Sequence, residues 1–448
     1  MSDSNGFNAE QLVDLNAGAL APVGNEITLA DLPVQGRIPP ALNGWLVRNG
    51  PNPYSGRFSA HGMLNWWPEA AMVHGLRLQK GKALEYRNRW LRTRQWAEYF
   101  NLPNPMRYPA TNPNVNVIRH AGKALALAEG GPPVVLDENL VSGEVPSQLA
   151  PGITAHPKVD PVSGELVWFR SSWAQPYLHY GVCDSQGEAR VEQVIPVTQP
   201  AVMHDFATTE RFSILLDLNV IYDLSLFERG LRIPIRWDDE RPARLGVLPR
   251  LGGEVHWFDI RPCFIQHVAN AYESGSNTIV LDAVRYPSFQ VLNEEGNGFL
   301  PNPLGELWRF ELNLQTGNVK EQRILRRFLE MPRINDTLTG RPHRYVYGVL
   351  QPTDEEMRGV VRMDTLTGEA LEHVPPPGDQ NSEPVFVADP QRLASEAGGW
   401  LLFYAYRVAT DTCDLMILDA EAPDKDPVAS VPLPRRIPAG FHGAWLPG

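Results

Sequence analysis

The six residues Asp160-Pro-Val-Ser-Gly-Glu165 form a turn signature that recurs as Asn313-Leu-Gln-Thr-Gly-Asn318 and Asp364-Thr-Leu-Thr-Gly-Glu369. In each stretch the leading Asp or Asn can hydrogen-bond backbone amides two residues on, and the Gly supplies a positive φ. A longer relative runs from Asp137 to Glu144. Such turns join antiparallel strands and are typical of the outer hairpins of propeller blades. A sandwich also contains many hairpins, so the irregular spacing leaves both architectures open.

Short apolar runs lie between turn residues along the chain. Most have the length and the Val, Leu, Phe, Tyr and Trp content of strands. They are Lys123–Glu129, Leu166–Arg170, Phe212–Leu218, Asn277–Val284, Leu307–Leu312, Arg344–Leu350 and Trp400–Tyr406. Only Gln95–Phe100 and Asp223–Glu228 suggest helices, each of a turn or two. The 41 Pro and 37 Gly point the same way, and an all-β fold is predicted.

The length of 448 residues would accommodate about three average domains, although large all-β folds often take up such chains in one unit. No Gly/Ser-rich or charged linker divides the sequence. We therefore predict a single domain over residues 1–448, with residues 1–40 as a polar, Pro-containing segment that wraps the body.

Charge and cysteine content exclude several classes. A net charge of −12 without a basic run argues against a nucleic-acid partner. Cys183, Cys263 and Cys413 are odd in number and far apart, which excludes a Cys-rich zinc site and favours a reducing, cytoplasmic setting. Neither a signal peptide nor a membrane span is expected. Peripheral contact with a membrane stays open, and no obligate protein partner is evident.

Four histidines stand in distinctive settings. They are His156 in Thr-Ala-His-Pro-Lys, His204 in Met-His-Asp-Phe, His267 in Gln-His-Val-Ala-Asn-Ala-Tyr-Glu and His442 in Gly-Phe-His-Gly-Ala-Trp. Neutral imidazole is the commonest metal ligand, and four of them without an obligatory carboxylate suit a redox-active divalent metal such as iron. Pro157 after His156, Asp205 and Phe206 after His204, and Gly440 and Gly443 around His442 suggest that the candidates lie at strand edges or turns. Because they are far apart in sequence, they can meet only if the fold brings distant segments to one point, as a radial fold would do at its axis.

The other seven histidines are interpreted as surface or core residues. They are His61, His74, His120, His179, His256, His343 and His373. His74 is expected at the edge of an early strand.

Together with these histidine contexts, several further segments resemble the carotenoid cleavage oxygenase family, which includes stilbene cleavage dioxygenases. They are Leu-Asn-Gly-Trp-Leu-Val-Arg-Asn-Gly-Pro-Asn-Pro (42–53), Tyr-Arg-Asn-Arg-Trp-Leu-Arg-Thr (86–93), Arg-Trp-Asp-Asp (236–239), Arg-Leu-Gly-Val-Leu-Pro-Arg (244–250), Ala-Tyr-Glu (271–273) and Phe-His-Gly-Ala-Trp (441–445). The resemblance covers nearly the whole chain, in the family's order.

The resemblance implies a seven-bladed β-propeller with an axial ferrous iron (Fe2+) and a loop-built cap over the substrate cavity. The metal ligands would be His156, His204, His267 and His442. Three glutamates would hold the outer N–H groups of three ligands, in the pairs Glu129–His204, Glu330–His267 and Glu383–His442. Such a carboxylate fixes the tautomer of a ligating imidazole, holds its ring and raises its basicity.

The activity implied by the resemblance is oxidative cleavage of a conjugated carbon–carbon double bond, with an apolar small molecule and O2 as the partners. Four neutral imidazoles leave the ion its full divalent charge and up to two open positions, and ferrous iron exchanges electrons with dioxygen whereas zinc does not. No organic cofactor is expected, because the substrate supplies the electrons. Consistent with this, the sequence contains no P-loop, dinucleotide fingerprint or nucleophile elbow. Aromatic side chains that would suit the tunnel are Trp66, Trp67, Trp96, Tyr99, Phe100 and Trp173, for each of which ordinary packing is an equal alternative.

Two departures from the family pattern bear on the substrate. Asn65-Trp-Trp-Pro-Glu-Ala-Ala-Met72 replaces a Gly-rich acidic loop with a stiffer one, which would reshape the substrate entrance. Stilbene-cleaving relatives often carry a lysine immediately before the first glutamate, where this chain has Ala128. This favours a carotenoid or apocarotenoid over a stilbene or phenylpropanoid alkene. A non-oxidative isomerase of the retinoid type, or a binding propeller, is the remaining alternative.

Overall fold

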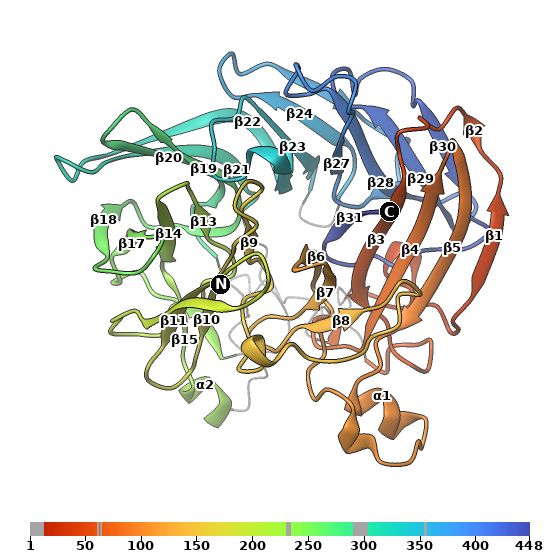
Figure 1. The fold of residues 1–448 in the computed structure, drawn as a ribbon, viewed down its shortest axis with the longest axis horizontal. Helices are drawn as coiled ribbons and strands as arrows, with labels where there is room; N and C mark the ends of the chain where they lie inside the picture. Colours follow the sequence, from red (N-terminus) through yellow and green to blue (C-terminus); the bar gives the residue numbers. More distant parts are fainter. Residues whose placement is uncertain (1–12, 61, 63–64, 230–233, 290–302, 354–355) are drawn as a thin grey trace, which may run out of the picture.

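Strands are the main regular elements of the described chain. The computed structural model describes residues 13–448 except 61, 63–64, 230–233, 290–302 and 354–355. The sheets radiate from a common centre, which is the arrangement of a β-propeller (Figure 1). The two α-helices of the described residues are α1 (Arg94–Tyr99) and α2 (Ser225–Glu228), both where short helices were predicted.

The described strands form seven blades, which we number along the chain and list from the axis outward. Blade 1 contains β31 (Gly443–Pro447), β3 (Gly44–Pro51), β4 (Ala71–Gln79), β5 (Lys82–Trp90) and β1 (Thr28–Leu32). Blade 2 contains β6 (Asn116–His120), β7 (Lys123–Leu127) and β8 (Val134–Leu136). Blade 3 contains β9 (Lys158–Val159), β10 (Leu166–Ser171), β11 (Leu178–Cys183) and β12 (Ala189–Val194). Blade 4 contains β13 (Ala207–Thr208), β14 (Phe212–Asp217), β17 (Ala243–Pro249) and β18 (His256–Ile260).

The remaining blades share a strand. Blade 5 contains β19 (Phe264–Ser274), β20 (Thr278–Tyr286), β21 (Glu306–Asn313) and the first part of β22 (Val319–Arg333). Blade 6 contains the last part of β22, β23 (Tyr345–Leu350), β24 (Val360–Asp364) and β25 (Ala370–His373). Blade 7 contains β26 (Gln380–Asn381), β27 (Val385–Ala388), β28 (Gly399–Arg407), β29 (Thr412–Asp419), β30 (Ala429–Pro432) and β2 (Gln35–Gly36). A hairpin of β15 (Val220–Tyr222) and β16 (Ile235–Trp237) extends from blade 4 and carries α2.

Blade 1 closes the ring by combining the two ends of the described chain. The C-terminal strand β31 pairs antiparallel with β3, from Gly44 opposite Pro447 to Arg48 opposite Gly443. Figure 1 shows the blue β31 beside the red β3. The N-terminal strands β1 and β2 pair with β5 and β30, on the outer sides of blades 1 and 7. Residues 1–12 of the predicted wrapping segment lie outside the described residues.

The strand β22 changes blades along its length. Val319–Arg323 pairs with β21 as the outermost strand of blade 5, whereas Leu329–Arg333 pairs with β23 as the innermost strand of blade 6. The register shifts between Glu330 and Arg333, and Met331 has a positive φ of 52°. This irregularity lies at the axis, next to the side chain of Glu330.

The recurrent turn has the expected chemistry. Its leading residue accepts hydrogen bonds from the amides two and three positions on at Asp160, Asn313 and Asp364. The corresponding glycines have φ values of +70°, +74° and +76° at Gly164, Gly317 and Gly368.

The placement of one of these turns was predicted wrongly. The turns at Asn313 and Asp364 are outer hairpins of blades 5 and 6, but the turn at Asp160 joins β9 and β10, the inner strands of blade 3. The ladder of β9 begins only at Lys158, because the preceding Pro157 has no N–H to donate.

Apolar clusters fill the interfaces between neighbouring blades. One cluster joins blades 1 and 7, others join blades 1 and 2, blades 2 and 3, blades 5 and 6, and blades 6 and 7, and the largest spans blades 3, 4 and 5. Sheets in face-to-face contact bury the side chains of both faces. The inner strands are therefore held in fixed positions around the axis by the packing further out.

The three cysteines, Cys183, Cys263 and Cys413, are buried free thiols. None of the helices in the described part of the chain has the length and apolar character needed to span a membrane.

Candidate metal centre

Four inner strands bring the predicted histidines to the axis. His156 lies two residues before β9, His204 three residues before β13 and His442 one residue before β31. His267 lies inside β19, at a shift of register between Ile265 and Val268. An irregularity of this kind re-aims a side chain that would otherwise alternate with the pleat. Of the three other blades, blade 6 carries Glu330 and blade 7 carries Glu383 on inner segments, and blade 2 carries Glu129 just after its second strand, β7.

The four imidazoles converge on one point. Their nearest ring nitrogens all lie within 4.8 Å of one another. The Nε2 atoms of His156 and His204 are 3.0 Å apart. Imidazole nitrogens bind Zn2+ at about 2.0–2.1 Å, which places nitrogens on neighbouring corners of a coordination polyhedron ~3 Å apart. The Nε2 atom of His267 is buried and has no hydrogen-bond partner among the described residues. The donor set therefore fits a metal ion.

Glu330 anchors His267 from blade 6. Its Oε2 atom accepts hydrogen bonds from His267 Nδ1 and from the Met331 amide, each at 2.6 Å. Its Oε1 atom accepts the Tyr286 hydroxyl at 2.5 Å. The side chains of His267, Glu330 and Tyr286 are buried. Because the outer nitrogen of His267 donates to a carboxylate, its Nε2 lone pair faces the centre.

Glu383 anchors His442 from blade 7. Its Oε1 atom lies 3.1 Å from His442 Nδ1, and its Oε2 atom accepts the Gly443 amide at 2.9 Å. Arg333 of blade 6 approaches the same carboxylate at 3.6 Å. Burial opposes ionisation of Glu383, but Arg333 and His442 outweigh it and hold the pKa of Glu383 at about 2. The carboxylate is thus fully ionised where it faces the imidazole.

Glu129 anchors His204 in a more open setting. Its Oε2 atom lies 2.9 Å from His204 Nδ1, with the Glu129 side chain 38% exposed against 7% for Glu330 and 3% for Glu383. Glu129 is therefore the most exposed of the three carboxylates. Glu129 follows the end of β7, where the chain leaves the sheet. All three carboxylate–imidazole contacts join the residues that the resemblance paired.

The surroundings tune the proton affinity of three of the rings. Burial, followed by the neighbouring imidazoles and Lys158, lowers the pKa of His156 well below 6.5. Burial also lowers the pKa of His442, against the opposing effect of Glu383. For His267 burial acts in the same direction, but the Glu330 carboxylate outweighs it and raises the pKa. Neutral rings are the form that binds metals.

Comparison with known proteins agrees with this geometry. The family model of the retinal pigment epithelial membrane protein matches residues 20–447. The carotenoid cleavage oxygenase of Mycobacterium tuberculosis is 36% identical, with 96% of this chain and 97% of that protein covered. The carotenoid 9,10(9',10')-cleavage dioxygenase of Crocus sativus is 31% identical over 96% of this chain and 88% of its own length. The chain belongs to the carotenoid cleavage oxygenase family.

A solved structure and a further relative extend the comparison. The cobalt-substituted apocarotenoid oxygenase of Synechocystis has a TM-score of 0.85 and 26% identity, covering 95% of this chain and 97% of the solved chain. The isoeugenol monooxygenase of Pseudomonas nitroreducens is 29% identical over 96% of this chain and 97% of its own length.

In this structure a cavity of about 300 Å³ adjoins His156, His267 and His442 along the axis. It is lined by the inner strands and includes charged side chains, among them Lys158, Asp205 and Arg333. Tyr222 belongs to an aromatic group: it contacts Trp173 at 5.9 Å between ring centroids, and Trp173 contacts Phe227 at 5.6 Å. Burial and the Glu129 carboxylate raise the pKa of Tyr222. The axial cavity therefore has a partly charged lining, and the aromatic group of Trp173, Tyr222 and Phe227 lies within electrostatic range of Glu129.

The other aromatic candidates occupy two places. Trp66 is buried against Phe441, the neighbour of His442, with 4.5 Å between ring centroids, and Trp67 packs against the same cluster. Trp96, Tyr99 and Phe100 lie on or next to α1, where Tyr99 and Phe100 are exposed.

The remaining histidines lie away from the four-histidine centre. His74 lies in mid-strand in β4 and bonds to the Tyr86 hydroxyl at 2.9 Å, so its predicted position at an edge is wrong. His343 is buried with its Nε2 atom 3.1 Å from Asp282. His120 bonds to a backbone carbonyl, and His61 lies outside the described residues. His179, His256 and His373 belong to β11, β18 and β25.

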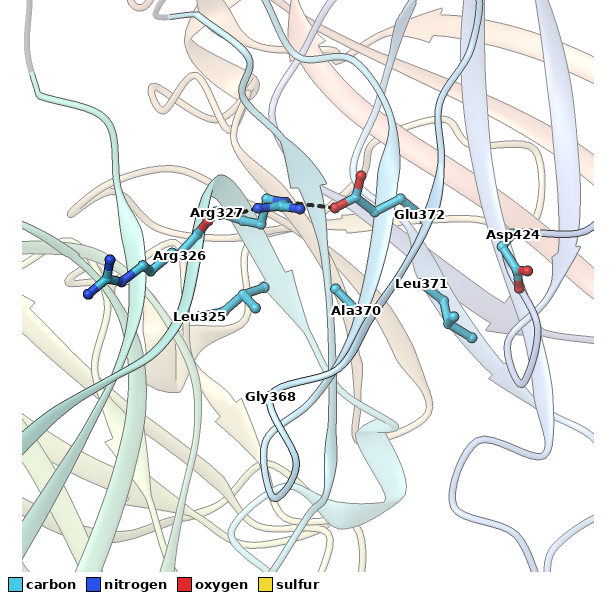
Figure 2. A pocket seen from close by; sticks show the side chains of 8 residues that line it. All are labelled: Leu325, Arg326, Arg327, Gly368, Ala370, Leu371, Glu372 and Asp424. Atoms are coloured by element: carbon cyan, nitrogen blue, oxygen red, sulfur yellow. Dashed lines mark hydrogen bonds and ion pairs between the residues drawn. The ribbon is translucent and has the colours of Figure 1, made fainter.

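A second hollow lies on the outer side of blades 6 and 7, with a volume of about 480 Å³. Figure 2 shows its lining from β22, β25 and the loop at Asp424, with Arg327 paired to Glu372. The distance of that ion pair is 3.0 Å. None of the four histidines lines this hollow.

Sequence reasoning missed Asp205, Lys158 and Arg333 at the centre. Asp205 and Lys158 lie within two residues of His204 and His156, and Arg333 lies three residues after Glu330. Their proximity to the candidate residues was the available signal. Their partners belong to other blades, so no local pattern in the sequence identifies them.

Proposed function

We propose that this protein is a non-haem iron(II) dioxygenase that cleaves a conjugated carbon–carbon double bond of a carotenoid or apocarotenoid. The double bond and one molecule of O2 would give two carbonyl products, so no external reductant or organic cofactor is needed. The convergence of four imidazoles, three of them backed by carboxylates, is the observation that carries the proposal. The relatives named as carotenoid-cleaving enzymes support the substrate class.

The proposed ligands are His156, His204, His267 and His442, through the ring nitrogens that face one another. Ferrous iron held there would supply the electron exchange with dioxygen that lets O2 react with an alkene. Neutral imidazole ligands leave the divalent charge uncompensated. The carboxylates of Glu129, Glu330 and Glu383 would restore charge balance from a distance and keep the outer ring nitrogens protonated.

The protein's own part in the reaction is to position the substrate and to exclude water from the metal centre. His156, His267 and His442 are buried, which keeps bulk water from the centre. The aromatic group of Trp173, Tyr222 and Phe227 offers rigid apolar surface for a polyene. We therefore propose that the substrate approaches from the side of Glu129. The charged lining of the axial cavity is unsuited to a polyene.

Reconstitution tests the proposal. Metal-free protein is loaded with Fe2+ or with Zn2+, and each form is incubated with a panel of carotenoids, apocarotenoids and stilbenes under 18O-labelled dioxygen. The iron form is expected to give labelled aldehydes or ketones from a polyene, and the zinc form none. Replacement of any one of the four histidines by alanine is expected to abolish both metal binding and turnover. Absence of carbonyl product from every polyene would refute the proposed activity.

The second candidate substrate is a phenylpropanoid or stilbene alkene, favoured by the similarity to an isoeugenol monooxygenase. Ala128 argues against it, because a methyl group offers no charge to a phenolic oxygen. Product analysis with isoeugenol and hydroxystilbenes in the same panel separates the two. Oxygen consumption upon addition of substrate excludes the third alternative, a non-oxidative isomerase or binding propeller.

We further propose that residues 1–448 form one domain, which the pairing of β31 with β3 and of β2 with β30 supports. A reducing, cytoplasmic setting is proposed from the three free thiols.

A further inference from the structure

One carboxylate connects three of the four histidine-bearing strands. The side chain of Asp205 is 2% exposed, and its Oδ1 atom accepts hydrogen bonds from Lys158 Nζ and from the Phe206 amide, each at 2.7 Å. Its Oδ2 atom accepts the Val268 amide at 2.8 Å. Lys158, Asp205 and Val268 lie two, one and one residues after His156, His204 and His267. The contacts therefore join blades 3, 4 and 5 beside the metal centre.

Two of the three strands that this carboxylate connects have very short ladders. The inner strands β9 and β13 have only two residues each, Lys158–Val159 and Ala207–Thr208. Two paired residues supply little of the backbone bonding that fixes an inner strand. His156 and His204 both precede these short strands. Additional contacts are needed to keep their rings at a constant separation.

His156 also lacks the support that the other rings have. Glu129, Glu330 and Glu383 each contact one imidazole, and in the described part of the chain no carboxylate forms an ion pair with His156. The His156 backbone is held by a hydrogen bond from its amide to Thr154 Oγ1 at 3.0 Å. Lys158 follows through Pro157, whose fixed φ couples the direction of the two residues. A contact that fixes the position of Lys158 therefore also restricts the position of His156.

We propose that Asp205 and Lys158 are positioning residues of the metal centre, which set the separation of His156, His204 and His267 in place of the carboxylate that His156 lacks. The inference rests on the proposed metal centre and extends it to residues that contact neither metal nor substrate. The Lys158 side chain is 20% exposed and borders the axial cavity, so its charge is only partly screened by water. Charge-assisted bonds of this kind are among the stronger ones in proteins.

The test uses Co2+ as the probe and the full-length protein. Lys158→Met removes the charge with little loss of volume, and Lys158→Arg retains the charge. Lys123→Met is the matched control, because it removes a lysine–glutamate pair of 2.8 Å that is exposed on blade 2. Metal-free forms of the wild type and of each variant are titrated with Co2+, with the visible spectrum of the bound ion recorded. The melting temperature of each metal-free form is measured separately.

Lys158→Met is expected to bind Co2+ about 10-fold more weakly, the lower end for an outer partner of a metal ligand, and to shift its absorption bands. Lys158→Arg is expected to restore the spectrum, and Lys123→Met to match the wild type in both. An unchanged affinity and spectrum in Lys158→Met would overturn the inference, whatever happens to its melting temperature. Failure of the wild type to bind Co2+ would instead refute the metal centre on which the inference depends.

Discussion

Substitution of Glu330 can separate the effect of its carboxylate on metal affinity from its effect on the stability of the fold. Its carboxylate accepts three hydrogen bonds of 2.5–2.6 Å, from His267, Met331 and Tyr286. Glu330→Gln keeps the shape of the side chain and removes the charge. The amide carbonyl can still accept from His267 and Met331, and the Tyr286 hydroxyl can turn to accept from the new NH2 group. We expect a loss of only ~1–2 kcal/mol in the unfolding free energy of the metal-free protein.

The effect of this substitution on metal binding is expected to be larger. A neutral amide no longer raises the basicity of His267, and loss of such a partner commonly reduces affinity by about 10- to 100-fold. At ~1.4 kcal/mol per factor of ten, this corresponds to ~1.4–2.8 kcal/mol. Tyr286→Phe should have the opposite pattern, with a larger effect on stability than on metal affinity. It leaves a buried carboxylate oxygen without its donor and costs ~1–3 kcal/mol in stability, but it leaves the His267 contact intact and changes affinity by less than about threefold.

Two measurements on the same preparations test this pair. Urea unfolding of the metal-free proteins gives the stability, and competition with a chromophoric chelator gives the Fe2+ affinity. The expected result is a crossed pattern, in which Glu330→Gln loses more affinity and Tyr286→Phe loses more stability. If both variants lost affinity and stability in the same proportion, Glu330 would be a packing residue and the argument for a tuned His267 would fail.

Three further perturbations probe the second glutamate, a buried turn and the metal itself. Glu129→Gln should weaken Fe2+ binding by less than Glu330→Gln in the same titration, because its exposed side chain lets water replace part of the lost contact. Asp160→Asn should cost ~2 kcal/mol at pH 7 and little near pH 2 in urea melts. Burial opposes ionisation of Asp160, but hydrogen bonds from Arg250 and the turn amides hold its pKa at about 2. Its contribution to the unfolding free energy is therefore complete above the unfolded-state pKa of ~3.9 and is lost as the pH falls through about 2. Removal of the metal with a chelator should lower the melting temperature. If the free metal concentration was about 100 times Kd before removal, the protein loses ~2.7 kcal/mol of unfolding free energy. An unchanged melting temperature would speak against a bound metal.

Much of the secondary structure could be predicted from local sequence. The run Leu166–Arg170 became β10, and the run Trp400–Tyr406 became β28. Length and composition decide such strands locally. The two-residue strands β9 and β13 could not be predicted, because they exist only through pairing with their blades. The shared strand β22 also has no local signal at the point where it passes from blade 5 to blade 6.

The sequence predicted the histidines, the glutamates and Asp205 of the candidate site to different extents. The settings of His156 and His442 stand out because Pro157, Gly440 and Gly443 restrict or free the backbone next to them. The glutamates became visible only through the family resemblance, since most carboxylates in a protein face solvent, including many that adjoin apolar runs. Asp205 remained hidden for a physical reason. Its bond to Lys158 spans 47 residues, and such distances are decided by tertiary packing.

The distribution of these residues over the ring explains why the centre needs the whole propeller. Each of the seven blades supplies one of the seven candidate residues, four histidines and three glutamates. Contacts at the axis also join successive blades, as from His267 to Glu330 between blades 5 and 6 and from Gly443 to Glu383 between blades 1 and 7. His442 directly precedes β31, the strand that closes the ring against β3. A bound metal would therefore join the closing blade to three others, so that opening of the ring and loss of the metal would be thermodynamically coupled. Among the three glutamates, the exposed Glu129 would be the one that an entering substrate can contact.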